Sequence, residues 1–144
     1  MGEAPTLRLW ARYFDRSASP DTKSANPSDD WSVTRAGARL DWAPGKSDRF
    51  ALHAGLYDGE IGQTLQLTTQ LTPPYTSTFA TRSKIAGGHL MGRWQRQQDS
   101  GADLALQIYY DHSHRSDELV LTGTIDIVDV DFQQRRQANG HGLT

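Results

Sequence analysis

Two histidines, His112 and His114, stand two residues apart in the C-terminal half of the chain. Residues two apart on an extended strand project to the same side, so the pair could share a metal ion with Asp111 or Asp117 nearby. A histidine pair at the edge of an exposed loop is more often solvated. We therefore expect no metal site here.

Ser113 lies between the two histidines and forms the only local combination suited to nucleophilic catalysis. Neighbours on a strand face opposite ways, which separates the Ser113 hydroxyl from both imidazoles. The Gly87-Gly88 pair lacks the further glycine and the strand-to-helix setting of a dinucleotide loop. We expect no catalytic residue, no cofactor and no enzyme; a hydrolase remains the third hypothesis.

Carboxylates gather at Asp126, Asp129 and Asp131, with the last two expected to point into a polar interior. Such a cluster could hold a cation or pair with arginines of a neighbouring strand, and pairing is the preferred interpretation. Arg35 and Arg39 share the face of Asp41, which predicts a similar ladder of opposite charges.

The elements that position these groups are strands, because apolar and polar residues alternate with a period of two. In the first segment Leu7, Leu9, Ala11 and Tyr13 oppose arginines and aromatic residues. The pattern predicts six strands, at about 6–14, 31–42, 49–58, 85–97, 104–111 and 128–133. Ile125 and Ile127 have the wrong parity for the sixth strand, which suggests a bulge or a stretch beyond the buried zone.

The predicted connections alternate between long polar loops, at about 15–30, 59–84 and 113–120, and short turns at 43–46 and 98–101. Residues 64–71 could extend the second loop as a hairpin. Long links on one side and short turns on the other are typical of a bacterial outer-membrane barrel. Aromatic residues near strand ends on the apolar face, as in the girdles of such barrels, favour the same interpretation: Tyr13, Trp42, Trp94 and Tyr110.

Composition sets further bounds on the function. The 144 residues carry 15 Lys and Arg against 17 Asp and Glu, a net charge of −2, so no basic field predicts a nucleic-acid partner. Cysteine is absent, which excludes disulfides and thiolate metal sites. No run of about 18 apolar residues occurs, so we expect no membrane helix. The N-terminal MGEAPT lacks a basic region followed by an apolar stretch, so we do not expect it to be a signal peptide.

Seven runs along the chain resemble, in order and with similar loop lengths, the barrel of TonB-dependent outer-membrane receptors. They span nearly the whole sequence: LRLWARYFDR (7–16), DDW (29–31), ARLDW (38–42), LYDGEIGQ (56–63), GGHLMGRWQRQ (87–97), LALQIYYDHSHR (104–115) and DVDFQQR (129–135). The resemblance implies a barrel of about 22 strands in the outer membrane of a Gram-negative bacterium. It also implies uptake of a scarce ligand such as a siderophore or other metal chelate, a corrin or a saccharide.

Neither a plug domain, nor a TonB-contacting segment, nor a C-terminal strand ending in an aromatic residue is found. We expect residues 1–144 to be one all-β unit, an up-and-down meander forming part of a barrel wall. Its partners would be outer-membrane lipid, the transported ligand and, through the missing plug, the TonB complex. Alone, such a piece would self-associate through its strand edges.

Two criteria select the ligand-side candidates: the inward face of the strand alternation and a position along the strand near the long loops. The candidates are Arg12, Arg35, Tyr57, His89, Tyr109 and Asp111. The alternative function is a soluble β-sandwich or small barrel that binds a ligand or partner protein with its polar face, since a half-buried soluble sheet shows the same alternation.

Overall fold

The computed structural model describes residues 2–19, 28–98, 101–138 and 141–143, and side chains up to Arg136 within these ranges. All of its regular structure is strand, in the order β1 to β7 along the chain. The bounds are β1 Glu3–Arg16, β2 Trp31–Ala43, β3 Asp48–Thr68, β4 Thr76–Gln97, β5 Asp103–Asp117, β6 Thr122–Ala138 and β7 His141–Leu143.

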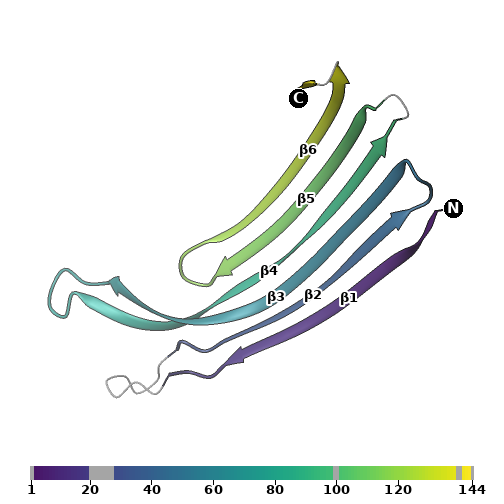
Figure 1. Ribbon diagram of the computed structural model, residues 1–144. Helices are drawn as coiled ribbons and strands as arrows, with labels where there is room; N and C mark the ends of the chain where they lie inside the picture. Colours follow the sequence, from purple (N-terminus) through teal and green to yellow (C-terminus); the bar gives the residue numbers. More distant parts are fainter. Residues whose placement is uncertain (1, 20–27, 99–100, 139–140, 144) are drawn as a thin grey trace.

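The strands form one antiparallel meander in which every strand pairs with the next along the chain, from β1 to β7. Figure 1 shows a single curved layer, with β1 at one margin and β6, with the short β7 paired to its end, at the other, and the β3–β4 hairpin projecting beyond its neighbours. The six predicted strands and their antiparallel order are confirmed, and the short β7 is added. Among the described residues, no helix is long and apolar enough to cross a membrane.

The layer does not enclose a core of its own. Its accessible surface is 11112 Å², whereas a compact monomer of 16.0 kDa exposes about 7,400 Å². Among the described residues, only Val33 and Ala102 are buried hydrophobic residues. A β-sandwich requires a second layer facing the first, and the described strands lie in a single meander layer.

The predicted loop over 59–84 is wrong for most of its length. β3 continues to Thr68 and β4 starts at Thr76, so only residues 69–75 connect them. The pairing runs without a shift from Asp48–Arg96 to Thr68–Thr76. The suggested hairpin extension is therefore correct in kind and longer than expected.

Other boundaries differ less. β5 continues to Asp117, so the predicted loop at 113–120 shrinks to residues 118–121. β6 pairs with β5 in unbroken register from Thr122 to Arg135, and the suggested bulge near Ile125 is absent. A register shift occurs instead in β1, between Glu3 and Thr6. Part of the predicted loop at 15–30 lies outside the described residues.

Candidate functional site

The two faces of the sheet differ in chemistry. One face carries an apolar belt across all six long strands, and the other, which we call the polar face, carries arginines, aspartates and aromatic residues. The belt consists of Leu7, Leu9, Ala11, Tyr13, Ala36, Ala38, Leu40, Trp42, Phe50, Leu52, Ala54, Leu56, Ala86, Gly88, Leu90, Gly92, Trp94, Leu104, Leu106, Ile108, Tyr110, Val128, Val130 and Phe132.

Both margins of the belt carry aromatic residues whose polar atoms point away from its centre. At the short-turn end, the Trp94 indole Nε1 donates to Asp48 Oδ1 over 2.9 Å. Toward the long links, the Tyr110 hydroxyl donates to Asp126 Oδ1 over 2.7 Å. Tryptophan and tyrosine hold this orientation where hydrocarbon meets a wet headgroup layer.

The belt is inclined to the strands. On β1 it runs from Leu7 to Tyr13, and along the pairing these residues are level with Ile108 and His114 of β5. On β5 the belt runs from Leu104 to Tyr110, so between β1 and β5 both margins move by four residues over four strands. The slope is a mean over these strands, because the belt runs from Ala86 to Trp94 on β4 and from Val128 to Phe132 on β6. With about 3.4 Å per residue along a strand and about 4.8 Å between strands, the belt is inclined by about 35° from the perpendicular to the strands.

The slope has a direct geometric meaning. A belt that is level in a membrane departs from the perpendicular to the strands by the angle at which the strands tilt from the bilayer normal, and barrel strands tilt by about 35–45°. Four alternating positions cover about eight residues, about 27 Å of strand, which at this tilt gives a height of about 22 Å. Membrane barrels carry a band about 25 Å tall.

The six ligand-side candidates all lie on the polar face, in two groups. Arg12, Arg35 and Tyr57 are consecutive cross-strand partners on β1, β2 and β3. The Tyr57 phenol then covers Gly87 of β4, where an added Cβ would lie 2.6 Å from its hydroxyl oxygen. This row therefore presents two guanidinium groups beside a phenol.

The second group is His89, Tyr109 and Asp111. His89 is the cross-strand partner of Asp111, and its imidazole stacks on the Tyr109 ring at 6.2 Å between centroids. The Tyr109 hydroxyl donates to Asp111 Oδ2 over 3.1 Å. The polar face thus carries a hydrogen-bonded group with one carboxylate, Asp111, on β4 and β5 and two arginines, Arg12 and Arg35, on β1 and β2, with β3 between them.

Beside Tyr57 of the first group, the polar face carries an open hollow of about 490 Å³ toward the long-link end. Its lining is mainly apolar and includes Tyr57, Ile85, Leu121 and Ile125. The inward parity of Ile125, which the sequence pattern left unexplained, thus gives the hollow one of its walls.

Asp117 is an enclosed carboxylate of the polar face, with 9% of its side chain exposed. It accepts from Arg115 Nε over 2.8 Å, from Arg115 Nη2 over 3.3 Å and from Gln63 Nε2 over 3.2 Å. The bonds from Arg115 contribute most to lowering the pKa of this carboxyl below its usual value. The node ties the end of β5 to β3.

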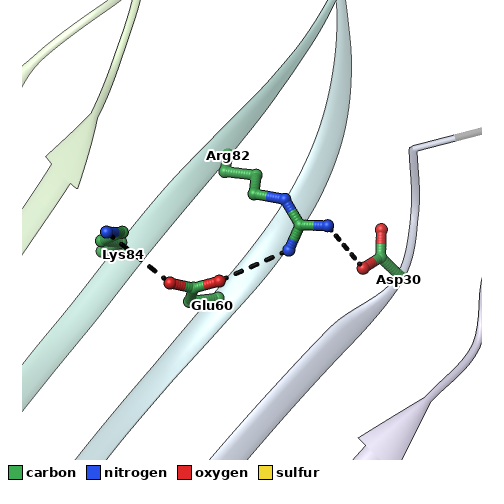
Figure 2. Close-up of polar contacts among 4 residues, drawn as sticks. All are labelled: Asp30, Glu60, Arg82 and Lys84. Carbon is green, nitrogen blue, oxygen red and sulfur yellow. Dashed lines mark hydrogen bonds and ion pairs between the residues drawn. The ribbon is translucent and has the colours of Figure 1, made fainter.

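Four charged residues link the elements at the long-link end, beyond the belt on its own face. Figure 2 shows Arg82 between Asp30 and Glu60, with Lys84 beside Glu60. The distances are 3.3 Å from Arg82 to Asp30, 3.4 Å from Arg82 to Glu60 and 3.7 Å from Lys84 to Glu60. All four side chains are exposed enough that each pair contributes little stability. Their effect is to connect the chain before β2 to the β3–β4 hairpin.

The histidine pair lies on the belt side, just past its margin. His112 Nδ1 is 2.7 Å from Asp126 Oδ1, and His114 Nδ1 is 2.9 Å from Thr124 Oγ1. Their acidic neighbour is therefore Asp126, whereas Asp111 and Asp117 bond on the polar face. The described residues contain no group of three ligands that could hold a metal ion.

Of the predicted carboxylate cluster, Asp129 and Asp131 share the polar face as expected, whereas Asp126 projects from the opposite face, so the three carboxylates do not lie together. Asp131 accepts from Gln133 Nε2 over 2.8 Å, and neither inward aspartate bonds to an arginine within the described residues. The predicted ladder holds for one pair, in which Arg39 donates two hydrogen bonds to Asp41, over 2.6 and 2.9 Å.

Comparison with known proteins returned no matching family model, no matching curated protein and no matching solved structure.

Trp10 is the main residue of this site that the sequence reasoning missed. Its indole covers Gly37 on β2, and Arg12 Cζ lies 5.9 Å from its ring centroid. The alternation of arginine and aromatic residues from Arg8 to Arg16 was a visible signal. Only the strand register shows that Trp10 adjoins Arg35 as well.

Proposed function

We propose that this chain forms part of the wall of an outer-membrane β-barrel receptor of the TonB-dependent kind. In this role the apolar belt contacts lipid and the polar face lines the path of an imported small ligand. The observation that carries the proposal is the belt itself, which has aromatic margins and, from β1 to β5, a mean slope of about 35° from the perpendicular to the strands.

The exposure of the belt supports lipid as its solvent. Leu9, Leu56 and Val128 are 70%, 69% and 70% exposed, and each lies within a continuous apolar surface. An apolar surface of this extent in water is a site of association or aggregation. Hydrocarbon would cover it without any further protein layer.

The polar face supports the ligand-side role. It groups arginine, tyrosine, histidine and aspartate side chains with a partly apolar hollow, which is the mixture that orients small ligands. The ligand-side assignment of Arg12, Arg35, Tyr57, His89, Tyr109 and Asp111 is part of this proposal. The outer-membrane location, and the role of the TonB complex through a plug, rest on the sequence resemblance.

Trp94 and Trp10 offer a direct test, because they lie on opposite faces of the sheet. Two variants keep a single tryptophan, one Trp94 and the other Trp10, with the remaining tryptophans replaced by phenylalanine. Both are inserted into phosphatidylcholine vesicles whose acyl chains carry bromine, which quenches indole fluorescence on contact. We expect strong quenching of Trp94 and weak quenching of Trp10. Equal quenching of the two indoles, or no insertion, would refute the lipid-facing belt.

A further inference from the structure

Arg35 occupies a position without any carboxylate around it. Eight positions surround it on the polar face, two on its own strand and three on each neighbouring strand: Val33, Gly37, Trp10, Arg12, Phe14, Gly55, Tyr57 and Gly59. One of these is a second arginine and none is acidic. Within the described residues Arg35 forms no ion pair.

The cross-strand pair Arg12–Arg35 therefore places two permanent positive charges directly opposite each other. Like charges in this position destabilise a sheet. The next arginine pair, Arg8–Arg39, differs because Asp41 bonds to Arg39. Within the described part of the chain neither Arg12 nor Arg35 forms an ion pair, so both guanidinium forks can bind an outside carboxylate.

Aromatic rings stand on both sides of this pair. Trp10 and Phe14 flank Arg12 along β1 and remain 40% and 43% exposed. The Trp10 indole lies low, over Gly37, and Arg12 is within cation–π distance of it. Tyr57 adds a phenol on the other side of Arg35.

We propose that Arg12 and Arg35 form a binding site for a carboxylate carried on a planar ring. The guanidinium forks would bind the carboxylate in the bidentate manner that suits arginine. The ring of the ligand would lie against the exposed Trp10 indole. Calling this compound the imported ligand rests on the proposed function, whereas its binding to the two arginines does not.

The test uses the full chain in detergent micelles, without any membrane. Benzoate is titrated while the indole N–H resonance of Trp10, assigned with Trp10→Phe, is followed by NMR. Two matched compounds separate charge from ring: cyclohexanecarboxylate has the charge without the planar ring, and benzyl alcohol has the ring without the charge. We expect benzoate to bind several-fold more tightly than cyclohexanecarboxylate, and benzyl alcohol to produce no saturable shift.

Variants locate the site. Arg12→Gln and Arg35→Gln should each weaken benzoate binding about tenfold or more. Arg49→Gln removes the same charge from the polar face near the β2–β3 turn and should leave the affinity unchanged. Arg35→Lys keeps the charge but loses the fork, so it should fall between wild type and Arg35→Gln. Circular dichroism of each variant checks that it is folded. Because Arg12 lies on the edge strand β1, we expect Arg12→Gln to disturb folding least.

The proposal is overturned if benzoate gives no saturable shift of Trp10, if benzyl alcohol binds as well as benzoate, or if Arg49→Gln weakens binding as much as Arg35→Gln. Failure of vesicle insertion with intact benzoate binding would refute the receptor-wall assignment alone. Insertion without benzoate binding would refute the carboxylate site alone.

Discussion

At the scale of single residues, the polar face is built from rings that lie over glycines. Trp10 covers Gly37, Tyr57 covers Gly87 and His89 covers Gly55 on an adjacent strand. Glycine inside a strand has an entropic cost and no side chain to pack. Its recurrence here is explained by the space that each ring needs beside the sheet.

Gly87 and Gly92, both on β4, provide a matched comparison of this effect. A Cβ at Gly87 would lie 2.5 Å from the His112 carbonyl oxygen, whereas a Cβ at Gly92 meets nothing nearer than Leu52 at 4.0 Å. We expect Gly87→Ala to lower the free energy of unfolding by about 1–3 kcal/mol, measured by urea titration in detergent. Gly92→Ala should be neutral or slightly stabilising. Equal effects would mean that the ring and backbone do not limit the space at Gly87.

Asp117 predicts a pH dependence of stability. Since Arg115 holds the folded-state pKa of this carboxyl below the unfolded-state value of about 3.9, its stabilisation is complete above that value. The stabilisation is lost as the pH falls through the folded-state pKa. Asp117→Asn should therefore be less stable than wild type at neutral pH, and the difference should shrink below about pH 4.

Asp129→Asn is the control for this measurement, because Asp129 has no hydrogen bond or ion pair among the described residues. Urea titrations of the three proteins at several pH values provide the comparison. A difference between wild type and Asp117→Asn that stays constant down to low pH would show that the Arg115–Asp117 pair does not contribute through ionisation.

Much of the candidate site was readable from parity. Arg12, Arg35, Tyr57, His89, Tyr109 and Asp111 share one face because all lie in phase with their strands. Parity does not say which strand residues stand opposite each other. The Arg12–Arg35 pairing and the His112–Asp126 bond depend on register, and register is set by turns and bulges that a single sequence specifies weakly.

At the scale of one strand, adjacent residues on β5 contact different surroundings. Ile108 lies in the belt between Gly92 and Val130, and Gln107 lies on the polar face between Arg93 and Asp131. Ile108→Arg should lower stability in vesicles by about 2–4 kcal/mol, since arginine on a lipid-facing strand is costly near the bilayer centre. Gln107→Arg should cost less than about 1 kcal/mol.

Urea unfolding of the two arginine variants in phosphatidylcholine vesicles measures both values. The matched variant Gln107→Arg controls for the added charge and length, because it differs from Ile108→Arg by one position and one face. A larger loss for Gln107→Arg than for Ile108→Arg would assign lipid to the wrong side of the sheet.

The strands were predicted best where the belt crosses them. There an apolar residue recurs at every second position, and the belt segments of β2, β3 and β5 were all identified. The distal parts of β3 and β4 lie beyond the belt, and there Leu65 and Leu67 of β3 and Phe79 of β4 lie on the side of the polar face. This hairpin was predicted mainly as a loop because its content of Thr, Gln, Pro and Gly, with Pro73-Pro74 at its middle, outweighed the short alternation of Leu65 and Leu67.

At the scale of the whole molecule, the sheet has two open margins and two exposed faces. Its accessible surface exceeds that of a compact monomer of the same mass by about half. Strand edges of this length pair readily with other chains. Under the proposed function, lipid would cover the apolar belt and further strands of the barrel would pair with the two margins.

The slope of the belt leads to a prediction about the orientation of the whole sheet in a membrane. If the belt lies level with the bilayer, the strands must tilt by about 35° from the bilayer normal. Polarised infrared spectroscopy of the chain in oriented phosphatidylcholine bilayers measures this angle from the dichroism of the amide I band. The single-layer stacks formed by aggregating strands would instead lie parallel to the bilayer plane or take no fixed orientation. Strands parallel to the bilayer plane, or strands without a fixed orientation, would show that the belt is not level with the hydrocarbon layer. A strand tilt near 35° from the bilayer normal would match the slope of the belt.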